Sequence, residues 1–354
     1  MIKDEYSPYK IVHQMEKLEE MKNGGQPDPV QVHLIPSNRC NQSCTFCAYR
    51  MPESASNQKF NANDMMSSEK LFEIIDSCKQ LGVKAIQYTG GGEPLVHPGI
   101  KEAFKRTLDN NMELALVSNG MALDDELIDI LSDISWVRVS VDSASKGTYS
   151  ILRRTKAGNF DVVAKNVRKL SNKKSGTVLG IGFVVSRENY LEIYDACKFF
   201  KDAGVDNFRI SATFTPLGLR YFDGILEEAK DIAQKAKVDL EDKDFTVFNL
   251  FNDRIGDLFD GVQEYDFCPM KELVPYLGAD LNVYTCCILA YNSLGYIGSL
   301  KDQTFEELWH SKEKIDFYNR HSPKVYCRLP CMFENKNDFI NYCIKKDPKH
   351  INFM

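Results

Sequence analysis

Short apolar segments alternate with stretches of helical periodicity from about residue 31 to residue 213, and this alternation constrains the fold more than any other feature. The short segments are typical of buried strands, and the periodic stretches are typical of helices that pack on one face. The predicted strands cover residues 31–36, 83–89, 113–117, 136–141, 177–185 and 208–213. The predicted helices cover residues 68–81, 99–108, 124–131, 160–170 and 190–203. Six strand–helix units favour parallel strands with right-handed crossovers, so we predict an α/β fold built on a partial (βα)6 TIM-like barrel.

The rest of the chain differs from this repeating part in pattern and in composition. A helical stretch at 224–238 and a charged segment at 239–244 lead away from the barrel, and six of the eleven cysteines follow residue 267. We therefore predict three parts: an N-terminal extension at 1–30, the barrel at 31–240, and a small Cys-rich α+β domain at 241–354.

Charge and cysteine usage exclude some partners and indicate a compartment. The net charge of −6 argues against a nucleic-acid-binding protein, which would usually present a basic face. The first 22 residues lack the apolar core of a signal peptide, and no apolar stretch is long enough to cross a membrane. Grouped cysteines in such a chain favour metal binding in a reducing cytoplasm over disulfides, so we expect a cytoplasmic protein without nucleic-acid or membrane partners.

Three cysteines follow the first predicted strand within eight residues. Cys40, Cys44 and Cys47 are spaced as CxxxCxxC, and Phe46 directly precedes the last of them. Three thiolates on one loop can bind three irons of a [4Fe-4S] cluster and leave the fourth iron open to a ligand that is not protein. A structural zinc site is the alternative, but such a site closes with four ligands, and only His33 lies near enough in the chain to add one.

This cysteine run resembles the signature of the radical S-adenosylmethionine (SAM) superfamily. The resemblance implies that SAM binds the open iron through its amino and carboxylate groups. It further implies that one electron from the cluster cleaves SAM to a 5′-deoxyadenosyl radical, which abstracts hydrogen from a substrate. A flavodoxin or ferredoxin is the implied reductant, and Phe46 is implied to contact the adenine.

Motifs at the ends of later predicted strands extend the resemblance. Gly91, Gly92 and Glu93 resemble the family's GGE motif, which holds the amino group of SAM, and a glycine run also lets the backbone approach a ligand closely. Ser118 and Ser140 look like positions that line the SAM pocket near the ribose. Both serines also suit an ordinary turn at a strand end.

Two further residues resemble family positions around SAM. Arg153 corresponds to an arginine that reaches the SAM carboxylate, for which a guanidinium fork is suited. Val184 lies on the fifth predicted strand, whose glycine-containing sequence resembles the family strand beside adenine, although the family's closing Glu is missing nearby.

The C-terminal cysteines resemble the SPASM and twitch domains of radical SAM enzymes. A hairpin near 278–282, an Ile-Gly-Ser turn and a short helix with Trp309 separate them in the order those domains show. The resemblance implies one auxiliary iron–sulfur cluster, expected to be [4Fe-4S]. Its predicted ligands are Cys268, Cys286, Cys327 and Cys331. Cys287 competes with Cys286, Cys343 is a possible substitute, and a zinc ribbon is the alternative for the whole region.

Taken together, the motifs predict a radical SAM enzyme with an auxiliary cluster. The 30 N-terminal residues are too short for the peptide-recognition domain of many peptide-modifying relatives, which favours a sugar, an aminosugar or a nucleotide-linked metabolite as substrate. By analogy with relatives that carry one auxiliary cluster, we expect a net dehydrogenation. Peptide epimerisation or thioether crosslinking is one alternative, and a non-catalytic iron–sulfur electron carrier is another. The sequence leaves the oligomeric state open.

Overall fold

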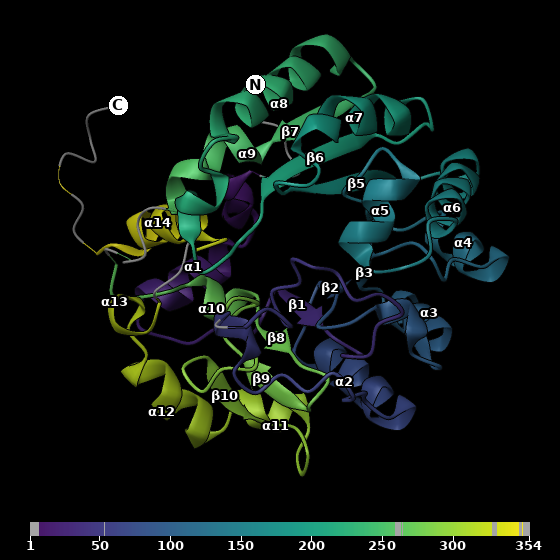
Figure 1. The fold of residues 1–354 in the computed structure, drawn as a ribbon. Coiled ribbons are helices and arrows are strands. Elements are labelled where there is room, and N and C mark those ends of the chain that lie inside the picture. Colours follow the sequence, from purple (N-terminus) through teal and green to yellow (C-terminus); the bar gives the residue numbers. More distant parts are fainter. Residues whose placement is uncertain are drawn as a thin grey trace.

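A single sheet of ten strands organises the molecule (Figure 1). The computed structural model describes residues 7–52, 54–258, 263, 265–327, 331–346 and 349. The strands are β1 (Gln31–Leu34), β2 (Ala85–Tyr88), β3 (Glu113–Ser118), β4 (Trp136–Ser140), β5 (Val178–Val185), β6 (Asn207–Ala212), β7 (Thr246–Asn249), β8 (Tyr276–Leu277), β9 (Asn282–Tyr284) and β10 (Tyr296–Ser299). Their order in the sheet is β10-β9-β8-β1-β2-β3-β4-β5-β6-β7.

Helices connect the strands and cover the outer face of the curved sheet (Figure 1). The α-helices are α1 (Met15–Lys22), α2 (Ser68–Gln80), α3 (Ile100–Asp109), α4 (Asp125–Leu131), α5 (Lys146–Arg153), α6 (Asn159–Lys173), α7 (Ile193–Lys201), α8 (Leu226–Leu240), α9 (Leu250–Arg254), α10 (Met270–Leu273), α11 (Phe305–Trp309), α12 (Lys312–Arg320), α13 (Pro323–Tyr326) and α14 (Glu334–Ile344). The 3-10 helices are η2 (Pro8–His13), η3 (Ala55–Asn57), η4 (Pro94–Val96), η5 (Tyr190–Glu192), η6 (Gly218–Phe222) and η7 (Ile255–Leu258).

The predicted α/β partial barrel is confirmed. Strands β1 to β7 pair in parallel, each with its sequence neighbour, and helices follow most of them. Local sequence explains the helix starts, because Ser67 and Asp124 cap α2 and α4 by accepting bonds from backbone N–H groups. In the described part of the chain no helix combines the length and the apolar character that crossing a bilayer requires.

Strand β7 is a seventh parallel strand that the periodicity did not predict. It pairs with β6 directly after the charged segment at 239–244. Its four residues are too few to show a period, and α8 before it continues the strand–helix alternation. The proposed boundary at residue 240 stays a prediction.

The C-terminal segment extends the same sheet instead of forming a separate one. Strand β8 pairs in parallel with β1, and the predicted hairpin follows as antiparallel β8–β9 and β9–β10 pairs. Helix α1 also packs against the C-terminal segment, since its Leu18 and Met21 lie in one apolar cluster with Met270 and Ile340. Both features place the C-terminal cysteines beside the start of the barrel.

Candidate active site

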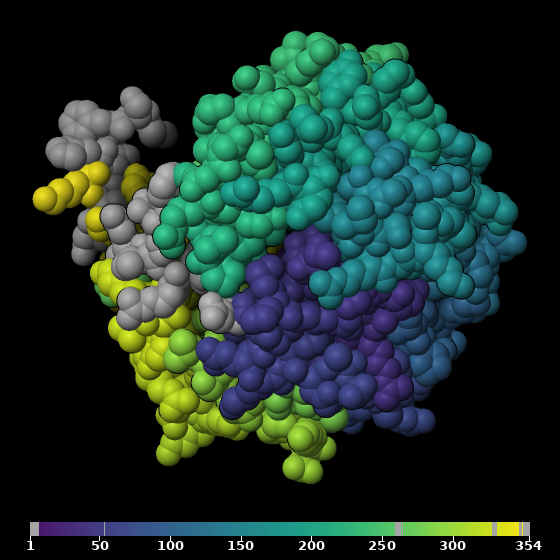
Figure 2. Space-filling view, viewed as in Figure 1, coloured from purple at the N-terminus to yellow at the C-terminus, as the bar shows by residue number. Residues whose placement is uncertain are grey.

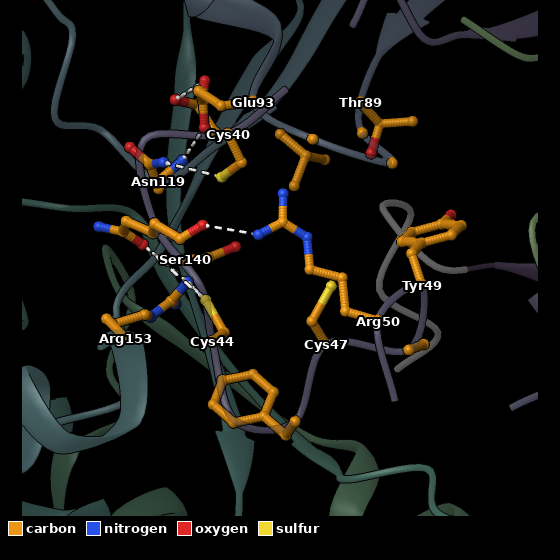
Figure 3. A pocket seen from close by; sticks show the side chains of 18 residues that line it. Cys40, Cys44, Cys47, Tyr49, Arg50, Thr89, Glu93, Asn119, Ser140 and Arg153 are labelled. Atoms are coloured by element: carbon orange, nitrogen blue, oxygen red, sulfur yellow. Dashed lines mark hydrogen bonds between the residues drawn. The ribbon is translucent and has the colours of Figure 1, made fainter. Parts of the chain in front are cut away.

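The three N-terminal cysteines lie on the loop that follows β1, at the carboxyl end of the parallel strands. The thiols of Cys40, Cys44 and Cys47 are free and half-buried, and they line a cavity of about 260 Å³. Figure 3 shows their sulfur atoms facing a common space. In Figure 2 the early part of the chain, coloured purple to blue, lies at the centre of the molecular face between the teal barrel and the yellow-green C-terminal part.

A turn of three glycines after β2 presses against the chain just before Cys40. The N–H of Gly92 donates to the carbonyl of Ser37 at 3.0 Å, and the N–H of Glu93 donates to that of Arg39 at 2.9 Å. A Cβ on Gly92 would lie 2.1 Å from the Arg39 carbonyl oxygen. Only glycine permits this approach, so the turn helps to set the position of the cysteine loop.

Glu93 is fully engaged inside the protein. Its carboxylate accepts bonds from the Ser118 hydroxyl at 2.7 Å, the Asn119 N–H at 2.7 Å and the Leu95 N–H at 3.1 Å. The side chain is 2% exposed, and burial raises the pKa of the carboxyl above its usual range. Glu93 and Ser118 therefore join the glycine turn to the end of β3, and the Ser118 hydroxyl also accepts the N–H of Gly120.

Arg153 reaches the cysteine loop from the end of α5. It forms a buried ion pair with Asp142, and its Nη1 lies 3.4 Å from both Gln42 Oε1 and Cys44 Sγ. Asp142 has a positive φ of 61° and also accepts the N–H of Val184 at 2.6 Å. Nε of Arg153 is buried and has no hydrogen-bond partner in the described part of the chain.

Most residues predicted around SAM do line this cavity. They are Phe46, Gly91, Gly92, Glu93, Ser118, Ser140 and Arg153. Val184 is not among the lining residues, and only its backbone is tied to the site, through Asp142. The roles assigned to all of these residues stay predictions.

Several lining residues were not found from the sequence. Gln42 donates to the Tyr149 hydroxyl at 2.8 Å and its carbonyl accepts a bond from Arg50 at 3.2 Å, so it lies at the centre of the cysteine loop. The position of Gln42 between Cys40 and Cys44 was the sequence feature that could have marked it as a residue of the cavity. Tyr49 and Thr89 also line the cavity, and no sequence pattern marked them.

The donor set suits an iron–sulfur cluster with a bound ligand beside it. Three thiols share one cavity, the glycine turn exposes backbone that no side chain can cover, and a buried guanidinium N–H has no described partner. Burial raises the pKa of the Cys40 thiol to about 11, with Glu93 acting in the same direction, so iron binding there must release a proton.

Four C-terminal cysteines influence one another electrostatically. Burial is the main cause that raises the pKa of the Cys327 thiol, and Cys286, Cys268 and Cys331 raise it further. Burial, then Cys331 and Cys286, raise the pKa of the Cys268 thiol to about 12. The same four residues were predicted as ligands of an auxiliary cluster. Their assignment stays a prediction, which this proximity supports.

The two competing cysteines have other surroundings. The thiol of Cys287 lies 3.6 Å from the Met332 sulfur and packs beside Tyr49. Cys343 belongs to the apolar cluster that α1 forms with the C-terminal segment, and burial alone raises its pKa. Cys343 fits an apolar packing role. Cys287 stays a competitor of Cys286, because Cys286 and Cys331 also raise the pKa of the Cys287 thiol after burial.

No compact site for a single ion is present among the described residues, since no three Cys, His, Asp or Glu side chains gather closely enough. A cluster at each group of cysteines stays a prediction.

Two family models match this chain. Residues 34–200 match the model described as the radical SAM superfamily, and residues 268–332 match the model of an iron–sulfur cluster-binding domain named SPASM. These ranges contain every cysteine predicted to bind iron. The two domains imply iron–sulfur clusters and SAM as cofactors.

Curated relatives match about half of this chain. GTP 3′,8-cyclase of Clostridium botulinum is 26% identical over 190 residues, which are 53% of this chain and 54% of that protein. The S-adenosylmethionine-dependent nucleotide dehydratase of Flammeovirga pacifica is 27% identical over 186 residues, 50% of this chain and 62% of that protein. The chain thus spans little more than half the length of these relatives.

Solved structures share the fold over nearly the whole chain. Streptococcus suis SuiB, bound to its precursor peptide SuiA, has a TM-score of 0.63 at 14% identity and covers 98% of this chain and 81% of its own. Native anSMEcpe with bound S-adenosylmethionine has a TM-score of 0.59 at 16% identity, and the match covers 90% of this chain and 92% of that chain.

Proposed function

This chain belongs to the radical SAM superfamily and carries a C-terminal iron–sulfur cluster-binding domain, and on that premise we propose that it cleaves SAM reductively and abstracts hydrogen from a small-molecule substrate. The observation that carries the proposal is the set of three free thiols, Cys40, Cys44 and Cys47, around one cavity at the carboxyl ends of the strands. Chemistry in barrels of this kind takes place at that end.

The residues around the cavity have separable roles in this proposal. When bound, the cluster and SAM supply one electron and a 5′-deoxyadenosyl radical that can remove a hydrogen atom. Cys40, Cys44 and Cys47 hold the iron. The glycine turn, fixed by Glu93, offers backbone to the amino group of SAM, and Arg153 offers its Nε–H to the carboxylate.

We assign Phe46, Ser140 and Val184 to the nucleoside part of SAM. Phe46 and Ser140 line the cavity, so they can contact the adenine and the ribose respectively. Val184 can act through its neighbours, because its N–H fixes Asp142, which pairs with Arg153. The electron comes from a flavodoxin or ferredoxin in this proposal.

The overall reaction that we propose is oxidation of an alcohol to a ketone. The oxidation would release a carbon-bound hydrogen atom, a hydroxyl proton and one further electron. Bound SAM would supply the acceptor of the hydrogen atom and solvent would take the proton. Cys268, Cys286, Cys327 and Cys331 would hold an auxiliary cluster able to accept the electron. Two hydrogens leave the alcohol, so atoms and electrons balance. The mutual proximity of these four thiols supports the presence of such an acceptor.

The substrate class that we favour is a sugar, an aminosugar or a nucleotide-linked metabolite. The names of two curated relatives, a GTP cyclase and a nucleotide dehydratase, support a nucleotide-linked compound. There are two alternatives: modification of a peptide, and a non-catalytic role as an electron carrier.

The first test is SAM cleavage by anaerobically reconstituted protein. Reduction with dithionite should give 5′-deoxyadenosine, and the Cys40→Ala/Cys44→Ala/Cys47→Ala variant should give none. Nucleotide sugars deuterated at the reacting carbon should accelerate formation of 5′-deoxyadenosine and pass their deuterium to it. Acceleration by peptides alone would support the alternative reaction, and an intact cluster that never cleaves SAM would leave only the electron carrier.

Iron content tests the auxiliary cluster. The parent should hold about eight irons per chain and the triple variant about four. About four in the parent and none in the variant would remove the proposed electron acceptor, and with it the dehydrogenation.

A further inference from the structure

A buried group of charges lies next to the C-terminal cysteines. Lys271 and Glu272 on α10 are each 1% exposed, and Lys314 on α12 is 2% exposed. Charged side chains are almost never buried to this degree unless they are paired. The partners of each charge therefore show what the group is built to stabilise.

Glu272 is paired with Lys314 and not with its chain neighbour. Nζ of Lys314 lies 2.6 Å from Glu272 Oε2 and 3.1 Å from Gln26 Oε1, and 4.5 Å from the centre of the Trp309 ring. Burial raises the pKa of Glu272 to about 7, and Lys314 opposes that rise most strongly. The Glu272 carboxylate is thus neutralised by the Lys314 ammonium.

Lys271 has only neutral partners. Its Nζ donates to the carbonyls of Tyr318 at 3.1 Å and His321 at 3.5 Å, and it lies 4.0 Å from the centre of the Tyr318 ring. In the described part of the chain no carboxylate lies within ion-pair distance of this Nζ. The two ring nitrogens of His321 lack hydrogen-bond partners there, and burial holds the pKa of this imidazole at about 3, so His321 is neutral.

The group therefore holds two ammoniums and one carboxylate, with one positive charge in excess. Lys271 lies one helical turn after Cys268, and its backbone N–H donates to the Cys268 carbonyl at 3.4 Å. Burial lowers the pKa of Lys271 to about 8, whereas Cys268 and Cys327 both favour its charged form and so raise that pKa, and Glu272 acts in the same direction as the two cysteines. Glu272 is already paired with Lys314. The thiolates are thus what remains to balance Lys271.

We propose that Lys271 is the fixed counter-ion of the auxiliary centre at Cys268, Cys286, Cys327 and Cys331, and that its charge raises the reduction potential of that centre. This inference rests on the proposed auxiliary cluster. Four thiolates give a cluster a net negative charge, and each added electron makes that charge larger. A buried positive charge nearby stabilises the reduced form more than the oxidised form, because solvent does not screen it. Such a bias favours a centre that accepts an electron.

The test is the reduction potential of the auxiliary centre in the intact protein, followed by EPR during a dithionite titration. Lys271→Met removes the charge and keeps the length of the side chain. We expect it to weaken electron binding about tenfold, equal to a potential more negative by about 59 mV for one electron. Lys271→Arg keeps the charge and should leave the potential near that of the parent.

Two variants separate charge from packing. Lys271→Met/Glu272→Gln removes one positive and one negative charge, so the buried group keeps its excess charge and the potential should return toward the parent value. Lys324→Met is the matched control, because Lys324 lies three residues from Cys327 but is exposed and paired with Asp266. It should not shift the potential.

Each outcome decides the inference. A shift in Lys271→Met that Lys271→Met/Glu272→Gln reverses supports it. An unchanged potential in Lys271→Met with full iron content overturns it, as does a parent protein whose C-terminal site gives no redox signal. Failure of SAM cleavage with a normal auxiliary signal would contradict the proposed function and leave this inference standing.

Discussion

At Arg153 a buried guanidinium meets a carboxylate, an amide oxygen and a cysteine sulfur. In the ion pair between Arg153 and Asp142, the arginine side chain is 6% exposed and the aspartate side chain is 1% exposed. A guanidinium so placed needs its partner, since removing one half of a buried pair leaves an uncompensated charge.

Asp142→Asn should therefore lower the free energy of unfolding by about 3–5 kcal/mol. Asparagine tolerates the positive φ at this position, so the loss reports the charge and not the backbone. Urea unfolding of the iron-free protein measures it. The matched control is Asp161→Asn, which breaks the exposed pair with Lys146 and should cost at most about 1 kcal/mol. Equal losses in both variants would contradict this account.

Adjacent cysteines at 286 and 287 give a second prediction at this scale. Cys286→Ser should lose the auxiliary cluster and leave about four irons per chain, whereas Cys287→Ser should keep about eight. The physical reason is that the Cys287 thiol faces Met332 and the aromatic cluster around Tyr49. Iron analysis and Mössbauer spectra distinguish the two variants, and the opposite result would reassign the ligand.

Among the elements, the glycine turn after β2 has the strictest spatial demand. Gly90, Gly91 and Gly92 each lie where a Cβ would meet another atom at 2.2 Å or less. The turn touches residues 37–39, so any shift there is transmitted to Cys40, which is at most three residues away.

Gly92→Ala should destabilise the protein by about 1–3 kcal/mol, because the added methyl overlaps backbone that cannot move freely. It should also lower iron binding at the cysteine loop. Thermal unfolding and iron content measure both effects. Gly147→Ala is the control, since nothing lies within 4 Å of its Cβ and alanine favours a helix. A Gly92→Ala variant with parent stability and iron content would show that the turn does not position the loop.

Across the whole molecule, the interior of the barrel places cations around a histidine. His33 on β1 has its pKa lowered to about 4 by burial and then by Lys336 and Arg138. Lys336 comes from α14 near the end of the chain, so this environment exists only when barrel and C-terminal segment are packed together.

Stability should consequently fall as the pH is lowered from about 6.5 to about 4. The folded pKa lies below the unfolded value of 6.5, so the unfolded chain binds the proton first and is stabilised relative to the folded one. The contribution of His33 is up to about 3 kcal/mol. Urea unfolding of iron-free protein at both ends of this range should show a smaller pH dependence in His33→Gln. His13→Gln, which changes an exposed histidine, should keep the parent dependence; an equal change in both would contradict the assignment.

Local patterns accounted for much of this molecule. The six predicted strands all match strands of the sheet, and helix starts at Ser67 and Asp124 followed their capping side chains. Helix α5 and strand β7 were missed. Each is short: α5 has eight residues with a glycine in its first turn, and β7 has four residues whose burial does not alternate.

By itself, the sequence determined the strand–helix order, the cysteine loop and the glycine turn, because each depends on residues within a few positions of one another. Tertiary structure alone decided that β8 lies beside β1, that Glu93 accepts bonds from Ser118, and that Lys271 lies buried among neutral partners near the C-terminal cysteines. These contacts join residues that are far apart in the chain. Ordering them costs chain entropy, which only the packing of the whole fold offsets, and no local pattern records which distant residues will meet.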